Sequence, residues 1–276
     1  CYLKAILSGT ILDHGGSVVI CKNPQVFGFL LVLCLLGDSA INAYGDEELS
    51  IRWHGQSFFE ITSPKGTRIV LDPHQIESYG RKQVEADLVL VSHLHSDHMQ
   101  LTAVTNKDKA KIINGLKVDS ETKRQEWDLR QEVFRDISVE VLGAYHDGQQ
   151  GLRRGKTGMF LIQIGKTKIL HCGDLGHALD GQTLRKVQGV DFLLLPIGGV
   201  YTINGEEARQ IMNSIKPRVA TIPMHYGTKV YDGLLGPEEF LDEVPKAAVK
   251  NLTSNQFKWS TSENVKEPMV LFLNHE

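Results

Sequence analysis

Short apolar runs separated by turn residues make up most of the chain from about residue 47 onward. The clearest is Ala86–Ser92, a continuous apolar run typical of a strand buried on both faces. Ile137–Tyr145 alternates apolar and polar positions, as a half-buried strand does. Gly158–Ile164 and Thr167–Cys172 flank a turn and predict a hairpin. Further strands are predicted at Leu49–Trp53, Ser57–Thr62, Thr67–Leu71, Val190–Leu195, Arg218–Pro223 and Met269–Leu273.

Three segments have helical character. Asn204–Ile215 begins with an N-cap asparagine and places Glu207 where a capping box requires it. Lys123–Glu132 is highly charged and is predicted as a surface helix, and Pro237–Val244 as a short one. Both halves of this region begin with hairpins and end in strand–helix units, which predicts an α+β fold with two mixed sheets packed as a sandwich and helices outside.

Composition narrows the class of protein. The 276 residues are 41% hydrophobic and 23% charged, which is typical of a folded globular chain. The 30 Lys and Arg residues face 33 Asp and Glu residues, so a polybasic nucleic-acid binder is disfavoured and no nucleic-acid partner is expected. Four cysteines are too few for a disulfide scaffold. No linker or low-complexity tract interrupts residues 44–276, which we expect to be one domain.

The first 43 residues have a different character. The first Met is Met99, so residues 1–20 are taken as a fragment edge or as translation upstream of the real start. Lys22, the apolar run Val26–Leu36 and a small-residue exit ending at Ala43 then form a signal-peptide pattern. The run is too short to span a bilayer, so no stable membrane span is expected. Two interpretations stay open: export to the periplasm or the extracellular space, or a buried N-terminal element of a cytoplasmic protein.

Metal-competent side chains gather directly after the Ala86–Ser92 strand. The sequence there is His93-Leu94-His95-Ser96-Asp97-His98. Imidazole and carboxylate groups suit Zn²⁺ and related divalent ions. The alternative, a solvent-exposed polar loop, is disfavoured because sites in such folds lie at strand ends.

Further ligand candidates also follow predicted strands. His146 follows Ile137–Tyr145, Asp174 follows Thr167–Cys172, and His225 follows Arg218–Pro223. A carboxylate can bridge two cations, and Asp174 is the candidate for that role.

With these residues the chain resembles the metallo-β-lactamase-fold hydrolase superfamily, through the HxHxDH motif and the order of the later His, Asp and His. The resemblance covers about residues 50–276 and implies a four-layer αββα sandwich with two mixed sheets and outer helices. It implies that His93, His95 and His146 bind one metal, that Asp97, His98 and His225 bind a second, and that Asp174 bridges both. It also implies that Asp72 supports the metal loop from behind.

The segment Trp53-His54-Gly55-Gln56-Ser57-Phe58-Phe59 is similar to the opening of one branch, which includes ascorbate-6-phosphate lactonase-like and N-acylphosphatidylethanolamine phospholipase D-like proteins. Asp174 argues against a subclass B3 β-lactamase, and His95 argues against the flavodiiron relatives, which carry Glu there. An RNase Z-like nuclease is disfavoured because the sequence shows no basic insertion.

The resulting hypothesis is a dinuclear hydrolase that uses a metal-bridging hydroxide on an ester, lactone or phosphodiester, with a small-molecule substrate. Asp97 is the expected catalytic residue, since it can orient the hydroxide or take its proton. Zn²⁺ is favoured by the His-rich ligands, with Mn²⁺ and Fe²⁺ as alternatives. Two other classes stay open: a metal-bound, non-catalytic binding or sensor module, and a periplasmic β-lactamase-like amidase.

Several residues are candidates for substrate contacts or for holding the ligands in place, each against an ordinary structural role. His54, His171 and His177 are candidates to face the site, and Tyr226 is a candidate oxyanion donor. Arg153 and Arg154 are candidates to bind an anionic substrate. Cys172 is expected to be a buried apolar residue and no nucleophile.

Overall fold

The computed structural model describes residues 48–260, 262–263 and 265–275. The predicted leader, the signal-like run and the expected boundary at residues 43–44 lie outside these residues. Within them, no helix has the length and apolar character needed to cross a bilayer.

The first of two mixed sheets has six strands: β1 (Glu48–Trp53), β2 (Phe59–Thr62), β3 (Arg68–Leu71), β4 (Leu88–Val91), β5 (Lys111–Asn114) and β15 (Gln256–Ser260). Their order is β15-β1-β2-β3-β4-β5. The pairs β3–β4 and β4–β5 are parallel, and the others are antiparallel. Strands β5 and β15 were not among the elements predicted from the sequence.

The second sheet has eight strands: β8 (Gln131–Phe134), β9 (Ile137–Tyr145), β10 (Lys156–Ile164), β11 (Thr167–His171), β12 (Phe192–Pro196), β13 (Ala220–Met224), β14 (Val249–Asn251) and β16 (Met269–Phe272). Their order is β14-β16-β13-β12-β11-β10-β9-β8. Strands β11, β12 and β13 are mutually parallel, so their carboxyl ends meet at one edge of the sheet.

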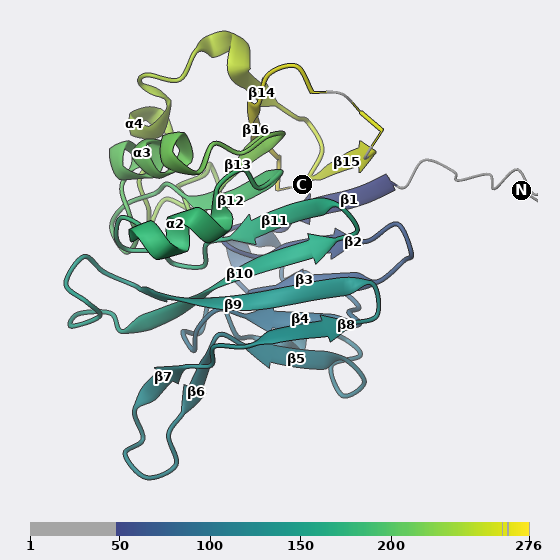
Figure 1. Ribbon diagram of the computed structural model, residues 1–276, viewed down its shortest axis with the longest axis vertical. Coiled ribbons are helices and arrows are strands. Elements are labelled where there is room, and N and C mark those ends of the chain that lie inside the picture. The colour runs from purple at the N-terminus through teal and green to yellow at the C-terminus, as the bar shows by residue number, and fades with distance from the viewer. Residues whose placement is uncertain (1–47, 261, 264, 276) are drawn as a thin grey trace, which may run out of the picture. The chain divides into compact units, whose positions relative to one another are not determined.

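Helices α2 (Gly181–Val187), α3 (Gly205–Ile215) and α4 (Glu238–Leu241) lie together beside the eight-stranded sheet (Figure 1). On the outer face of the six-stranded sheet, Ala103 of the 3₁₀ turn η2 (Leu101–Ala103) packs in one cluster with Val89 and Val91 of β4. Two further 3₁₀ turns are η1 (Glu77–Tyr79), between β3 and β4, and η3 (Lys246–Ala248), which precedes β14. Two mixed sheets with flanking helices confirm the predicted α+β sandwich. Among the described residues, the outer layer on the six-stranded side is made of turns rather than of α-helices.

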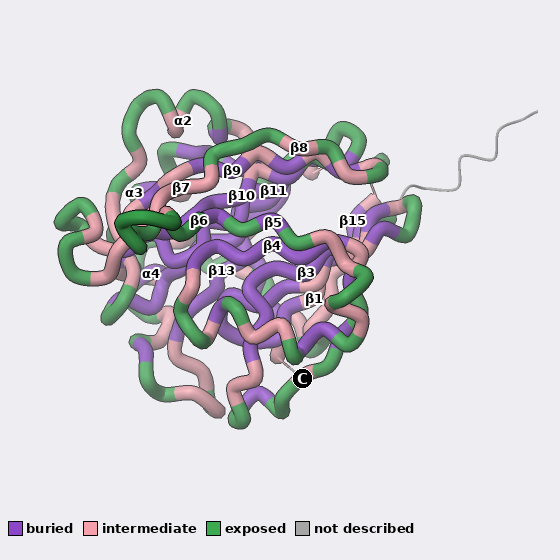
Figure 2. The backbone as a smooth tube through the Cα atoms, turned by 90° about the horizontal axis from the view of Figure 1, so that it is seen from below, coloured by how far each residue is buried: buried purple, intermediate pink, exposed green. Residues whose placement is uncertain are grey.

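Strand β4 shows why its run is continuously apolar. Leu88 and Leu90 point into the main core between the sheets, whereas Val89 and Val91 point into a second cluster on the outer face. Figure 2 shows the central strands as buried and the connecting loops as largely exposed. The loop after β4 therefore starts from a strand that is anchored on both sides.

One predicted element is wrong. The segment Lys123–Glu132 is not a helix: β7 (Gln125–Trp127) pairs with β6 (Leu116–Val118) in a two-stranded hairpin, and β8 begins at Gln131. The Trp127 indole donates to the carbonyls of Ala144 and Thr157, which ties the segment to the large sheet. These tertiary contacts decide the backbone conformation there, and a charge pattern cannot reveal them.

Candidate metal centre

The candidate ligands lie on loops that follow buried strands and meet at one edge of the sandwich. His93, His95, Asp97 and His98 follow β4, His146 follows β9, Asp174 follows β11, and His225 follows β13. Five of these side chains are buried, whereas His95 is exposed and Asp97 is partly exposed.

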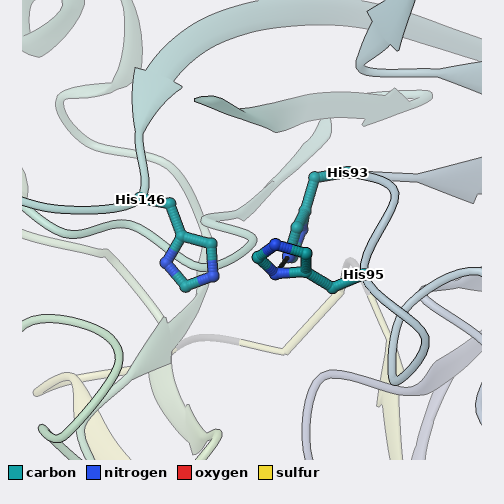
Figure 3. A group of neighbouring side chains, drawn as sticks. All are labelled: His93, His95 and His146. Atoms are coloured by element: carbon teal, nitrogen blue, oxygen red, sulfur yellow. Dashed lines mark hydrogen bonds between the residues drawn. The ribbon is translucent and has the colours of Figure 1, made fainter. Parts of the chain in front are cut away.

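The structure brings these residues into three groups of three, and within each group the ligand atoms lie within 4.8 Å of one another. One group is His93, His95 and His146, another is Asp97, His98 and His225, and a third joins His93 and His98 to Asp174. Figure 3 shows the three imidazoles of the first group turned toward a common point from two loops, one with His93 and His95 and the other with His146. The first two groups are the two ligand sets expected from the sequence, and the third links them.

Asp174 lies at the centre of the cluster. Its Oδ2 atom is 3.2 Å from Nε2 of His98, 3.2 Å from Nε2 of His146 and 3.3 Å from Nε2 of His225. Nε2 of His93 is 4.0 Å away from the same oxygen. One carboxylate oxygen therefore faces imidazoles of both groups, as a bridging ligand must.

Asp72 holds two of the imidazoles from behind. Its carboxylate accepts from the backbone N–H of Ser92 at 2.7 Å, from Ser92 Oγ at 2.6 Å and from Nδ1 of His98 at 2.9 Å. Because the Ser92 hydroxyl gives its only hydrogen to Asp72, it accepts from Nδ1 of His93 at 2.9 Å. Nε2 is thus the ring nitrogen through which both His93 and His98 can bind a metal.

The contact between His98 and Asp174 requires a cation. Neutral His98 would present a lone pair at Nε2 to a carboxylate oxygen that can only accept, and both side chains are almost completely buried. Without a metal, a proton satisfies the contact: burial opposes it, but Asp174 and Asp72 raise the pKa of His98 well above its ordinary value. Nδ1 of His146 and of His225 also lack hydrogen-bond partners among the described residues. This donor set fits divalent metal ions.

The two carboxylates of the cluster are ionised. Burial would raise the pKa of Asp174, but His225 and His98 hold it well below its ordinary value. Burial likewise opposes ionisation of Asp97, whereas its hydrogen bond with His98 lowers the pKa below the usual range. Both groups therefore present anionic oxygens to the cluster at neutral pH.

A cavity of about 310 Å³ opens over this cluster, and its lining residues are His95, Asp97, His146, Arg154, Asp174, Tyr201 and His225. A larger hollow of about 620 Å³ near Arg209 and Met269 contains none of the clustered ligands, so the chemistry lies in the smaller one. Arg154 was among the residues predicted to contact the substrate, whereas Tyr201 was not predicted. The signal was present, because Tyr201 lies in the loop that follows β12, next to the loops that carry Asp174 and His225.

His171 and His177 hold loops in place. Nδ1 of His171 accepts from the N–H of Gly173, so Nε2 donates to the Ser57 carbonyl at 3.1 Å. Nε2 of His177 accepts from the N–H of Tyr145, and Nδ1 donates to the Ala178 carbonyl. Neither lines the cavity. His171 fixes the approach to Asp174, and His177 fixes the end of β9 before His146.

Two predicted contacts with the cavity are not present. His54 packs against the Phe58 ring, 4.6 Å between centroids, with Nε2 3.9 Å from a Glu60 carboxylate oxygen. Tyr226 stacks on Trp53 at 5.6 Å and is 7% exposed, and burial raises its pKa. Neither lines the cavity, because the backbone directs both rings into aromatic clusters.

Arg153 lies in the neighbouring surface hollow rather than over the cluster. Cys172 is fully buried and unpaired, and burial raises the pKa of its thiol, as expected for a residue with no nucleophilic role.

Comparisons with known proteins agree with this fold. Residues 50–225 match the beta-lactamase superfamily domain. A solved structure from Thermotoga maritima, assigned to the metallo-beta-lactamase superfamily, is 26% identical with a TM-score of 0.60, over 82% of this chain and 98% of that one. The chain therefore belongs to the metallo-beta-lactamase superfamily of metal-dependent hydrolases.

The chain is also similar to two curated UPF0173 proteins and to a further solved structure. A UPF0173 protein of Pyrococcus furiosus is 34% identical over 209 residues, which cover 73% of this chain and 93% of that protein. A UPF0173 metal-dependent hydrolase of Thermoplasma acidophilum is 30% identical over 195 residues, 66% of this chain and 85% of the relative. A metallo hydrolase of Ignicoccus hospitalis, 21% identical, shares the fold with a TM-score of 0.52, over 72% of this chain and 91% of that one.

Proposed function

We propose that the protein is a dinuclear hydrolase of small esters, lactones or phosphodiesters. In this proposal His93, His95 and His146 bind one ion, Asp97, His98 and His225 bind the other, and Asp174 contacts both. The observation that carries it is the position of Asp174 Oδ2, 3.2–3.3 Å from three Nε2 atoms that belong to both ligand groups.

The donor set favours zinc. Five of the seven ligands are imidazoles and the other two are carboxylates, a combination that suits Zn²⁺ better than Mg²⁺ or Ca²⁺. Mn²⁺ and Fe²⁺ are the alternatives. When bound, two such ions would supply hydroxide at physiological pH by lowering the pKa of bound water.

The protein groups have separate tasks. Asp97 lines the cavity and is ionised, so it can orient the attacking water or take up its proton. Asp72 and Ser92 fix the ring orientation of His93 and His98, which keeps the geometry constant during turnover. The open cavity gives a substrate access to the cluster. The similarity to a relative named a metal-dependent hydrolase favours an enzyme over a metal-bound binding module.

The test combines metal content with turnover. Purified protein is loaded with Zn²⁺, its metal is measured by elemental analysis, and chromogenic esters, lactones, phosphodiesters and a β-lactam are assayed. We expect two equivalents of metal and turnover of at least one ester, lactone or phosphodiester. Two equivalents with no turnover of any substrate would favour the non-catalytic module, and turnover of the β-lactam alone would favour the amidase.

A further inference from the structure

An arginine lies on the wall of the candidate metal cavity. Arg154 lines it together with Tyr201, and the other lining residues are candidate ligands. Arginine is the one cationic side chain in this lining.

Local contacts hold Arg154 firmly. Its Nη2 donates to the Val200 carbonyl at 2.9 Å, and its guanidinium carbon lies 4.9 Å from the centre of the Tyr201 ring. Its backbone N–H donates at 2.7 Å to Asp147, whose carboxylate also accepts from the N–H groups of three other loop residues: Gln149, Gly151 and Arg153. The side chain is therefore placed at the cavity in advance, with N–H donors left over.

No carboxylate in the described part of the chain forms an ion pair with Arg154. Other arginines do have such partners: Arg52 pairs with Glu60, and Arg218 with Asp191. A fixed guanidinium beside the candidate ligand cluster, without an ion-paired carboxylate among the described residues, offers the planar donor fork that carboxylates and phosphates accept.

The contact that holds Arg154 comes from a strained residue. Val200, whose carbonyl accepts from Arg154, has a φ of 55°, which is a genuine outlier for a β-branched side chain. Such strain persists where the surrounding structure enforces it, and it clusters at ligand-binding sites. The same loop exposes Val200 by 52% and Tyr201 by 47%, and Leu235, 54% exposed, is joined to it through its N–H bond to Gly198. The cavity thus has a cation on its wall and apolar side chains beside it.

We propose that Arg154, braced by the Tyr201 ring and the Val200 carbonyl, binds a negatively charged group, carboxylate or phosphate, of an organic substrate. The inference rests on the proposed function, because it names the class of substrate for that site. Arg154 is the specificity-determining residue, and Tyr201 is a positioning residue that acts through it. Recognition itself makes and breaks no covalent bond.

Binding of non-reactive anions tests the inference without turnover. Benzoate and phenylphosphonate are titrated calorimetrically into the zinc-loaded wild-type protein and the variants Arg154→Ala, Arg154→Lys and Arg153→Ala. We expect Arg154→Ala to weaken binding of at least one anion 10- to 100-fold, because charge-assisted hydrogen bonds are lost. Arg154→Lys should recover part of the loss, and the matched neighbour variant Arg153→Ala should bind like the wild type. The anion that is affected more identifies carboxylate or phosphate as the recognised group.

Unchanged binding in Arg154→Ala, or an equal loss in Arg153→Ala, would overturn the inference. Tyr201→Phe should bind as the wild type does, whereas Tyr201→Leu should lose about threefold, since only the leucine variant removes the aromatic face. Metal content is measured for every variant, so that a loss of metal is not mistaken for a loss of anion binding.

Turnover provides a second readout that separates the two proposals. Arg154→Ala should raise KM for mono-4-nitrophenyl glutarate about 10- to 100-fold with little change in kcat, and should leave kcat/KM for neutral 4-nitrophenyl acetate within about twofold. Equal effects on both esters would contradict anion recognition while leaving the hydrolase proposal intact. Anion binding that depends on Arg154, without turnover of any substrate, would support anion recognition and contradict the hydrolase proposal.

Discussion

At the scale of single residues, the site has more hydrogen-bond acceptors around His98 than a neutral imidazole can satisfy. Asp72, Asp174 and Asp97 surround His98, which is fully buried. In the metal-free protein both ring nitrogens of His98 must be protonated, because Nδ1 faces Asp72, Nε2 faces Asp174, and ionised carboxylates only accept hydrogen bonds. A divalent ion can replace that proton and satisfy the histidines at the same time.

The substitution Asp174→Ala removes the atom on which three Nε2 nitrogens converge. We expect metal content to fall below two equivalents and turnover to fall at least about 100-fold, since even residues that only orient ligands cost 10- to 100-fold. Elemental analysis and an assay on the best substrate measure both. If the variant kept two ions and the full rate, Asp174 would not bridge them.

Asp72 is tested by Asp72→Asn, which puts an amide where Ser92 and His98 need acceptors. We expect metal affinity to fall about 10- to 100-fold, as measured by competition with a chromogenic chelator. Asp87→Asn is the matched control, because Asp87 accepts from the Arg68 N–H on the same sheet, at the opposite end of β4. Equal losses in both variants would assign Asp72 a general structural role.

His74 predicts a pH dependence of stability. It is buried and neutral: Nδ1 accepts from Ile76 N–H, Nε2 donates to the Gly55 carbonyl, and burial lowers its pKa to about 4. Between about pH 6.5 and 4, the unfolded chain therefore binds a proton that the folded chain refuses, and stability falls as the pH falls. Because of this residue, the free energy of unfolding is lower by about 3 kcal/mol near pH 4 than above pH 6.5, where the residue has no such effect.

Urea unfolding of metal-free wild type and His74→Gln at pH 7 and pH 4.5 measures this difference. The glutamine keeps one donor and one acceptor but does not titrate, so its loss of stability over this range should be smaller. Parallel losses in the two proteins would show that His74 does not contribute.

At the scale of elements, the candidate ligands lie in loops directly after strands β4, β9, β11 and β13. Sequence alone predicted β9 with its observed bounds, and the capping box of Asn204 and Glu207 at the start of α3 is present. These features are local and follow from alternation and capping chemistry. The pairing of β1 with β15, more than 190 residues apart, has no local signature and could not be read from the pattern. The sequence places Tyr201 in the loop after a predicted strand, but which side chain of that loop lines the cavity depends on the folded structure.

The close approach of two loops predicts the effect of Gly198→Ala. A Cβ atom on Gly198, in the loop after β12, would lie 2.3 Å from the carbonyl oxygen of His225, so one of the loops must move. We expect turnover to fall about 100-fold, since a displacement of about 1 Å at an active site has that effect. Gly181→Ala is the control, because its Cβ would meet only the end of Arg185 at 3.6 Å. Normal metal content and rate in Gly198→Ala would show that the loops adapt.

At the scale of the whole molecule, two sheets make one edge rigid enough to assemble seven side chains from distant parts of the sequence. The motif at 93–98 and the order of His146, Asp174 and His225 were sufficient to predict which residues meet, and the structure brings their ligand atoms within 4.8 Å in overlapping groups. The substrate contacts predicted for His54 and Tyr226 failed because the direction of a side chain at a loop depends on packing that the sequence does not display.

Anomalous diffraction at the zinc edge from crystals of the zinc-loaded protein shows whether two ions bind and which residues hold them. We expect two peaks, each with its ligand atoms at about 2.0–2.3 Å. The ion at one peak should be bound by His93, His95 and His146, and the ion at the other by Asp97, His98 and His225. Asp174 should contact both ions. A single peak, or two peaks that Asp174 does not join, would contradict the dinuclear site.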